Sequence, residues 1–141
     1  MSAGLVVGYD GSACGEAALD AALEIAHKLS EPIVVVFGYA PPGTWGGEIA
    51  EHEEAIEELG EKVTAQARSH AAADGLEVEV ELVAQRAAEA LMEVAERRDA
   101  RMIVVGSYGE QPLKGIILGS TPNRLLHLSE RPVLVVPASE S

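Results

Sequence analysis

The chain has 141 residues, of which 48% are hydrophobic and 23% charged, a composition that predicts one globular domain (1–141) and excludes a wholly disordered chain. Ten basic residues against 23 acidic ones give a net charge of −13, which repels polyanions, so we expect no nucleic acid and no membrane among its partners. No apolar run reaches the ~20 residues that span a bilayer and no basic residue marks a signal peptide, so the expected location is cytoplasmic.

Cys14 is the single cysteine. An internal disulfide is therefore impossible, and a reducing compartment fits. A thiol at a helix start can be reactive because the helix dipole favours the thiolate. A small semi-buried filler is the favoured interpretation, because free cysteine is so often buried.

The first part of the chain predicts two buried strands with a helix between them. Residues 5–9 form an apolar run that ends at Asp10-Gly11-Ser12, and residues 33–37 form a β-branched run. Runs of this kind are typical of parallel strands covered on both faces. Apolar residues recur at helical spacing between them, from Ser12 as the predicted N-cap to Ser30.

A loop over residues 38–47 leads into a long helix. Ile56, Leu59, Val63, Ala67 and Ala71 mark its apolar stripe, and Gly75 is the predicted residue just after its end. The acidic residues between 48 and 61 fit either a docking surface for a basic partner or a solvated helix face. The solvated face is favoured because acidic residues complement a helix N-terminus.

The second part of the chain alternates strands and helices. Residues 76–83 alternate apolar and acidic side chains, which predicts a strand at a sheet edge with one face in water. The next helix has an apolar stripe over residues 87–95 and closes at Arg97-Arg98. The remaining predicted elements are a strand at 102–105, a short helix at 122–128 and a strand at 133–136.

This alternation predicts a five-stranded parallel sheet with helices on both faces. The right-handed crossover rule reduces the number of possible topologies. If the first strand is central and the chain winds one way through strands two and three before it returns to place four and five on the other side, the order is 3-2-1-4-5. The direction of winding then changes between the first and fourth strands, which end at Asp10 and Gly106. Ligands in such sheets bind at this point, outside the carboxyl ends of the strands.

The segment 106–120 is rich in glycine and precedes a helix start. Glycines allow backbone to approach a ligand closely, and a helix start offers unpaired N–H groups to phosphate. Ser120 and Thr121 add hydroxyls and either is a candidate N-cap, while Lys114 and Arg124 are nearby cations. On composition alone, phosphate binding and ordinary turn chemistry are equally good explanations.

The spacing of these glycines distinguishes the two explanations. The pattern G-x2-G-x9-G-[ST], formed by Gly106, Gly109, Gly119 and Ser120, resembles the ATP-binding motif of the universal stress protein family. The opening Val-Gly-Tyr-Asp-Gly-Ser and the closing Arg-Pro-Val-Leu-Val-Val-Pro are also similar to that family, so the likeness spans nearly the whole chain. It implies the 3-2-1-4-5 sheet, called adenine nucleotide alpha-hydrolase-like or Rossmann-like.

The resemblance also implies a ligand, ATP or a related adenine nucleotide with or without Mg²⁺, and a homodimer formed through Val133–Val136. It places Asp10 beside the adenosine and Gly38 beside the adenine. Hydroxyl and N–H groups near the start of the last helix would hold the phosphates. The complete set of implied nucleotide-binding residues is Asp10, Gly38, Val105, Gly106, Gly109, Gly119, Ser120 and Thr121.

Three functions remain open at this stage. The chain binds ATP as a regulator or sensor in a stress response, or it is a slow Mg²⁺-dependent ATPase, or it is a dimeric interaction module that needs no nucleotide. The first is favoured. Asp10 is also a frequent turn former in front of glycine, and the four histidines show no spacing typical of a zinc site.

Overall fold

The structure is a computed structural model that describes residues 4–39, 49–107 and 118–138. All strand pairs within it are parallel, and the order β3-β2-β1-β4-β5 confirms the predicted sheet. The strands are β1 (Leu5–Gly8), β2 (Ile33–Gly38), β3 (Glu79–Val83), β4 (Met102–Gly106) and β5 (Val133–Val136).

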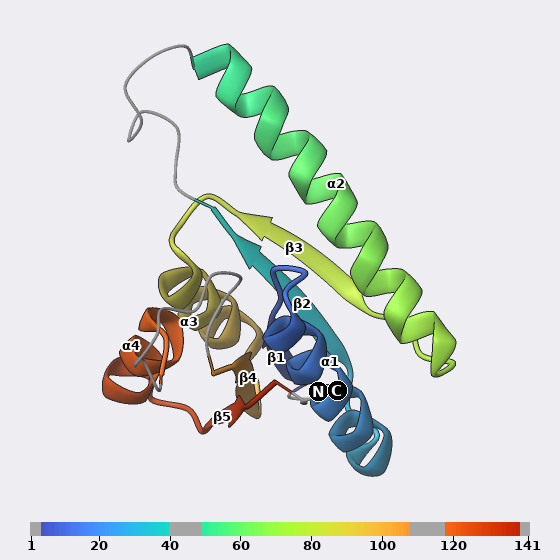
Figure 1. Cartoon of the computed structure of the whole chain (residues 1–141). Helices are drawn as coiled ribbons and strands as arrows, with labels where there is room; N and C mark the ends of the chain where they lie inside the picture. Colours follow the sequence, from blue (N-terminus) through green and yellow to red (C-terminus); the bar gives the residue numbers. More distant parts are fainter. Residues whose placement is uncertain (1–3, 40–48, 108–117, 139–141) are drawn as a thin grey trace.

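Helices cover both faces of this sheet (Figure 1). One face packs against α1 (Ala13–Leu29) and α2 (Ile49–Ala73), and the other against α3 (Ala87–Arg98) and α4 (Ser120–Leu128). Side chains alternate between the faces along β1, so Leu5 and Val7 join the α1 and α2 core and Val6 joins the α3 and α4 core. Two separate cores therefore hold β1 in the centre.

The ends of the first two helices are fixed by local hydrogen bonds, as the sequence predicts. The Ser12 Oγ accepts a hydrogen bond from the Gly15 N–H at 3.1 Å, so Ser12 is the N-cap of α1. Ser30 ends that helix in the left-handed region. After α2, Gly75 has a φ of +75°, where a glycine carries no Cβ penalty.

Strand β3 is shorter than the sequence predicts. The first residue that pairs with β2 is Glu79, opposite Val34. Before it, the Leu76 N–H donates to the Ala71 carbonyl and so belongs to the end of α2. The prediction of a strand over 76–83 was therefore wrong for its first three residues, while the predicted edge position of the strand is confirmed.

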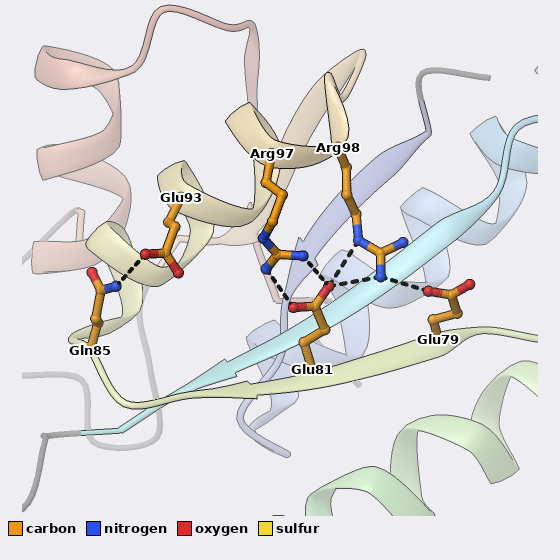
Figure 2. A network of polar contacts seen from close by, with 6 residues as sticks. All are labelled: Glu79, Glu81, Gln85, Glu93, Arg97 and Arg98. Carbon is orange, nitrogen blue, oxygen red and sulfur yellow. Dashed lines mark hydrogen bonds and ion pairs between the residues drawn. The ribbon is translucent and has the colours of Figure 1, made fainter. Parts of the chain in front are cut away.

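The acidic face of β3 is covered by arginines rather than by water alone (Figure 2). Arg97 Nη2 lies 2.6 Å from Glu81 Oε1, and Arg98 Nη2 lies 2.8 Å from Glu81 Oε2 and 2.7 Å from Glu79. The hydrogen bond from Arg97, aided by Arg98, outweighs partial burial and holds the pKa of Glu81 below its usual value. The expected wet face of β3 is confirmed at Glu79, whose side chain is 68% exposed, whereas Glu81 is only 22% exposed because both arginines at the end of α3 reach it.

The long helix α2 is polar on its outer side. Its described glutamates, which are Glu54, Glu57, Glu58 and Glu61, are exposed, as both the solvated-face interpretation and the docking-surface alternative require. Of the helices in the described part of the chain, none is both long and apolar enough to cross a bilayer.

Candidate functional site

A cleft of about 200 Å³ opens at the carboxyl ends of β1 and β4, where the direction of winding changes. It lies where the sequence analysis places a ligand. Gly109 falls outside the described residues. The other predicted site residues all line this cleft, namely Asp10, Gly38, Val105, Gly106, Gly119, Ser120 and Thr121.

Asp10 is held by the turn that follows β1. Its Oδ1 accepts a hydrogen bond from the Ser12 N–H at 2.9 Å and another from the Ser12 hydroxyl. A Cβ at Gly15 would come within 2.8 Å of the same oxygen, so glycine leaves room for this arrangement. The turn-forming role of Asp10 is therefore confirmed, and its exposed side chain also faces the cleft.

The start of α4 borders the opposite side of the cleft. Gly119 is the N-cap, with φ −69° and ψ 170°, and no side chain caps the helix. The expectation that Ser120 or Thr121 is the N-cap was wrong, because the Gly119 N–H donates to the Ser107 carbonyl at 2.6 Å and the helix starts directly after it. The N–H and hydroxyl groups of Ser120 and Thr121 thus occupy the first turn, where helices attract anions.

Residues from β2 and α3 form an apolar end of the cleft that sequence reasoning missed. Val36, Phe37, Ala87 and Leu91 contribute to it. A Cβ at Gly38 would lie 2.8 Å from the Gln85 carbonyl and 2.9 Å from the Ala87 Cα. The glycine after the β2 apolar run was the available signal, because it lets the start of α3 approach the strand.

Buried side chains support the floor of the cleft. Cys14 is only 1% exposed, so it is a filler as predicted but is buried more fully than expected, and its Sγ lies 3.6 Å from the Ser107 Oγ. A Cβ at Gly106 would come within 2.5 Å of the Cys14 Cβ and 2.7 Å of its carbonyl oxygen. The N-terminal turn of α1 therefore rests directly on the end of β4.

A polar chain behind the cleft joins α1 to α2. The buried Tyr9 hydroxyl donates to Glu16 Oε1 at 2.8 Å, and His70 Nδ1 lies 2.8 Å from Glu16 Oε2 while its Nε2 contacts Asp20. Burial and the Glu16 hydrogen bond raise the pKa of Tyr9 far above its usual range. Burial alone would lower the pKa of His70, but Asp20, Glu16 and Asp74 together raise it. The sequence offered no signal for this role of His70, since the spacing of the histidines spoke only against a zinc site.

Cationic side chains lie beside the cleft rather than in it. Among its described lining residues there is no Lys or Arg. Lys114 lies outside the described residues, and Arg124 pairs with Glu89, 2.6 Å from Nε to Oε2. Within the residues that the structure describes, no group of three or more His, Cys, Asp or Glu side chains could hold a metal ion.

A doubly wound parallel sheet with a ligand-sized cleft at its switch point defines an α/β protein of the Rossmann-like class. The comparison with protein families specifies this class further. The sequence model of the universal stress protein family matches residues 1–137. The chain therefore belongs to the universal stress protein family.

Individual relatives agree with this assignment. The chain is 33% identical over 139 residues to universal stress protein Rv2319c of Mycobacterium tuberculosis, with 94% of this chain and 48% of that protein covered. It is 28% identical to universal stress protein YxiE of Bacillus subtilis, covering 94% of this chain and 97% of that one. The chain thus spans about half the length of the mycobacterial relatives it matches.

Solved structures share the whole fold. A crystal structure of a universal stress protein in complex with cAMP superposes with a TM-score of 0.73 at 28% identity, covering 98% of this chain and 100% of that chain. A structure of a universal stress protein from Archaeoglobus fulgidus has a TM-score of 0.78 at 24% identity and covers 96% and 99% of the two chains. The second similarity concerns the fold alone.

Proposed function

We propose that this protein binds ATP in the cleft between the ends of β1 and β4 and acts as a nucleotide-dependent regulator in a stress response. The observation that carries the proposal is the meeting of the predicted nucleotide-binding residues in one cleft. They come from separate parts of the chain, so their meeting is a property of the fold. The cAMP complex of a relative with the same fold supports an adenine nucleotide as the class of ligand.

The two ends of the cleft suit the two ends of a nucleotide. The apolar end, with Val36, Phe37 and Leu91, offers the contacts that a planar base needs. The start of α4 offers N–H and hydroxyl groups to phosphate. These donors can bind phosphate locally although the net charge of −13 repels anions. Asp10 lies between the two ends of this proposed site, at the end of β1.

The decisive experiment is calorimetric titration with ATP and Mg²⁺ on the protein and on Gly119→Val. Valine is compatible with the Gly119 φ of −69°, so the variant should fold while its side chain blocks the phosphate path. Asn123→Ala, on the exposed side of the same helix, is the matched control and should bind normally. Unchanged affinity in Gly119→Val would show that the phosphates do not bind at this end of the cleft. If the unaltered protein does not bind ATP, the proposed function is wrong.

Hydrolysis is tested separately from binding. Phosphate release from ATP is followed with the unaltered protein and with Asp10→Asn, which keeps an oxygen that can accept the Ser12 hydrogen bonds. The regulator proposal expects no sustained release from either protein. Release that depends on Asp10 would favour the slow ATPase instead.

The regulator proposal includes a homodimer formed through β5. This strand lies at a sheet edge, and Leu134 is 36% exposed there. An apolar edge strand invites pairing with a second chain. Light scattering at micromolar concentration should report two copies, and a monomer would contradict the β5 dimer.

The buried free thiol of Cys14 supports a cytoplasmic setting, which is reducing.

A further inference from the structure

A second groove opens beside the cleft. It is lined by the first turn of α3 and by Ser120, Thr121 and Arg124 of α4. Ala87, Ser120 and Thr121 line both spaces, so the groove continues directly from the phosphate end of the cleft. We call it the arginine groove, because Arg86 of the α3 start and Arg124 both line it.

One nitrogen of the Arg124 guanidinium is hydrogen-bonded, and the other two are available to a ligand. Its Nε donates to Glu89 Oε2 at 2.6 Å. Its terminal nitrogens make no hydrogen bond with the described residues, and the Arg86 side chain, whose residue caps α3 only through its backbone carbonyl, makes none with them either. A guanidinium can hold a carboxylate through one edge and offer its remaining N–H groups to phosphate oxygens. Glu89 is thus a positioning residue for Arg124.

The charges around the cleft determine how many phosphates a bound nucleotide can carry. The described lining of the cleft contains no basic side chain, and it contains the carboxylate of Asp10. The chain as a whole carries a charge of −13. Each phosphate added to a nucleotide adds negative charge, so a longer phosphate chain is repelled unless cations meet it. The arginine groove supplies the cations that the described lining of the cleft lacks.

We propose that the arginine groove receives the terminal phosphates of a nucleoside triphosphate, so that Arg86 and Arg124 make the protein prefer a triphosphate to a monophosphate. This inference rests on the proposed function of the cleft. The donors at the start of α4 then serve the phosphate nearest the ribose, which a monophosphate also carries. The two arginines act only on phosphates that a monophosphate lacks.

The test compares affinities for Mg²⁺-ATP, ADP and AMP, measured by calorimetry at one ionic strength. Arg124→Gln and Arg86→Gln should each lower the affinity for ATP by about fivefold, as expected for one partly exposed charge-assisted contact. Both variants should leave the affinity for AMP within a factor of about two of the original, because their side chains do not reach its phosphate. Arg124→Lys should keep most of the preference for ATP.

Arg68→Gln is the matched control. Arg68 is exposed on α2, so its loss changes the net charge equally at a distance from the groove. It should change neither affinity. Where AMP binds too weakly to measure, the ratio of ATP to ADP affinity replaces the ratio of ATP to AMP.

Two sets of results overturn the inference while leaving the proposed function intact. One is equal affinity for ATP and AMP in the unaltered protein. The other is an ATP preference that Arg124→Gln and Arg86→Gln leave unchanged, or that Arg68→Gln reduces equally. If the unaltered protein binds none of the three nucleotides, the proposed function of the cleft fails as well.

Discussion

Gly106→Ala tests how closely the start of α1 rests on the end of β4. The new Cβ would lie 2.5 Å from the Cys14 Cβ and 2.7 Å from the Cys14 carbonyl oxygen, where ordinary contacts are 3.4 Å or more. The helix must therefore move by almost 1 Å, and part of the obstacle is backbone that cannot rotate away. Overpacking of this kind costs about 1–3 kcal/mol, and the backbone clash points to the upper end.

Thermal unfolding followed by circular dichroism should measure this cost. For a domain of this size, about 3 kcal/mol corresponds to a fall in Tm of roughly 10 °C. Gly60→Ala is the matched control, because there the new Cβ meets only the tip of the Leu82 side chain, which is 42% exposed and free to turn. Alanine is more stable than glycine in a helix interior by about 1 kcal/mol, and this gain offsets the cost of turning the Leu82 side chain aside. Gly60→Ala should therefore change Tm little.

A second comparison separates a clash with backbone from a clash with a side chain. Cys14→Ala keeps the Cβ and the carbonyl at position 14, so it should not rescue Gly106→Ala. A Tm of Gly106→Ala close to that of the unaltered protein would refute the close approach of α1 to β4. So would a full rescue by Cys14→Ala.

Two further predictions concern pH. The pKa of His70 is raised in the folded state, so its contacts with Glu16 and Asp20 stabilise the protein fully below the unfolded pKa of about 6.5 and lose this effect as the pH rises through the folded value. His70→Gln should therefore lower the free energy of unfolding by up to about 1 kcal/mol near pH 6 and by much less near pH 9, as measured by urea unfolding. The pKa of Glu81 is lowered in the folded state, so its ion pairs stabilise the protein above about pH 4.5, and this effect is lost as the pH falls through the folded pKa. Glu81→Gln should therefore lower the free energy of unfolding by about 1 kcal/mol at pH 7 and by little near pH 3. The control is Glu77→Gln, exposed just before β3, which should cost nothing at either pH.

The results that would contradict these pH predictions are distinct. For His70→Gln, a loss of stability that is the same at both pH values would show that the imidazolium charge is not involved. For Glu81→Gln, a loss equal to that of Glu77→Gln would show that the arginines at the end of α3 do not stabilise β3.

Local patterns in the sequence predicted the strands, the helices and a parallel sheet, while the 3-2-1-4-5 order and the place of the cleft also needed an assumed central first strand and the family resemblance. The β-branched runs and helical stripes each have a fixed period, and the crossover rule converts their order into a sheet. The start of β3 was misplaced because residue 79, rather than residue 76, faces the beginning of β2. Pairing with another strand determines that boundary, and no local pattern records it.

The site was predictable to a similar degree. Asp10 and the glycine pattern identified the cleft, but the N-cap of α4 depends on a hydrogen bond between Gly119 and Ser107, which are distant in the sequence. Arg86 was missed because arginine is not a usual N-cap and has no motif of its own. Its relevance appears only when α3 and α4 border the same groove.

The two edges of the sheet differ in charge, which bears on the size of the proposed homodimer. On the β3 edge, Glu79 and Glu81 are paired with Arg97 and Arg98, and charged side chains at a sheet edge oppose the addition of a strand. The β5 edge is apolar and carries no such charge. In the proposed homodimer, the β5 edges of two copies would pair by two-fold symmetry, and the charged β3 edges left outside would not add a further strand. The proposed dimer would therefore be a closed pair and not the start of a fibre.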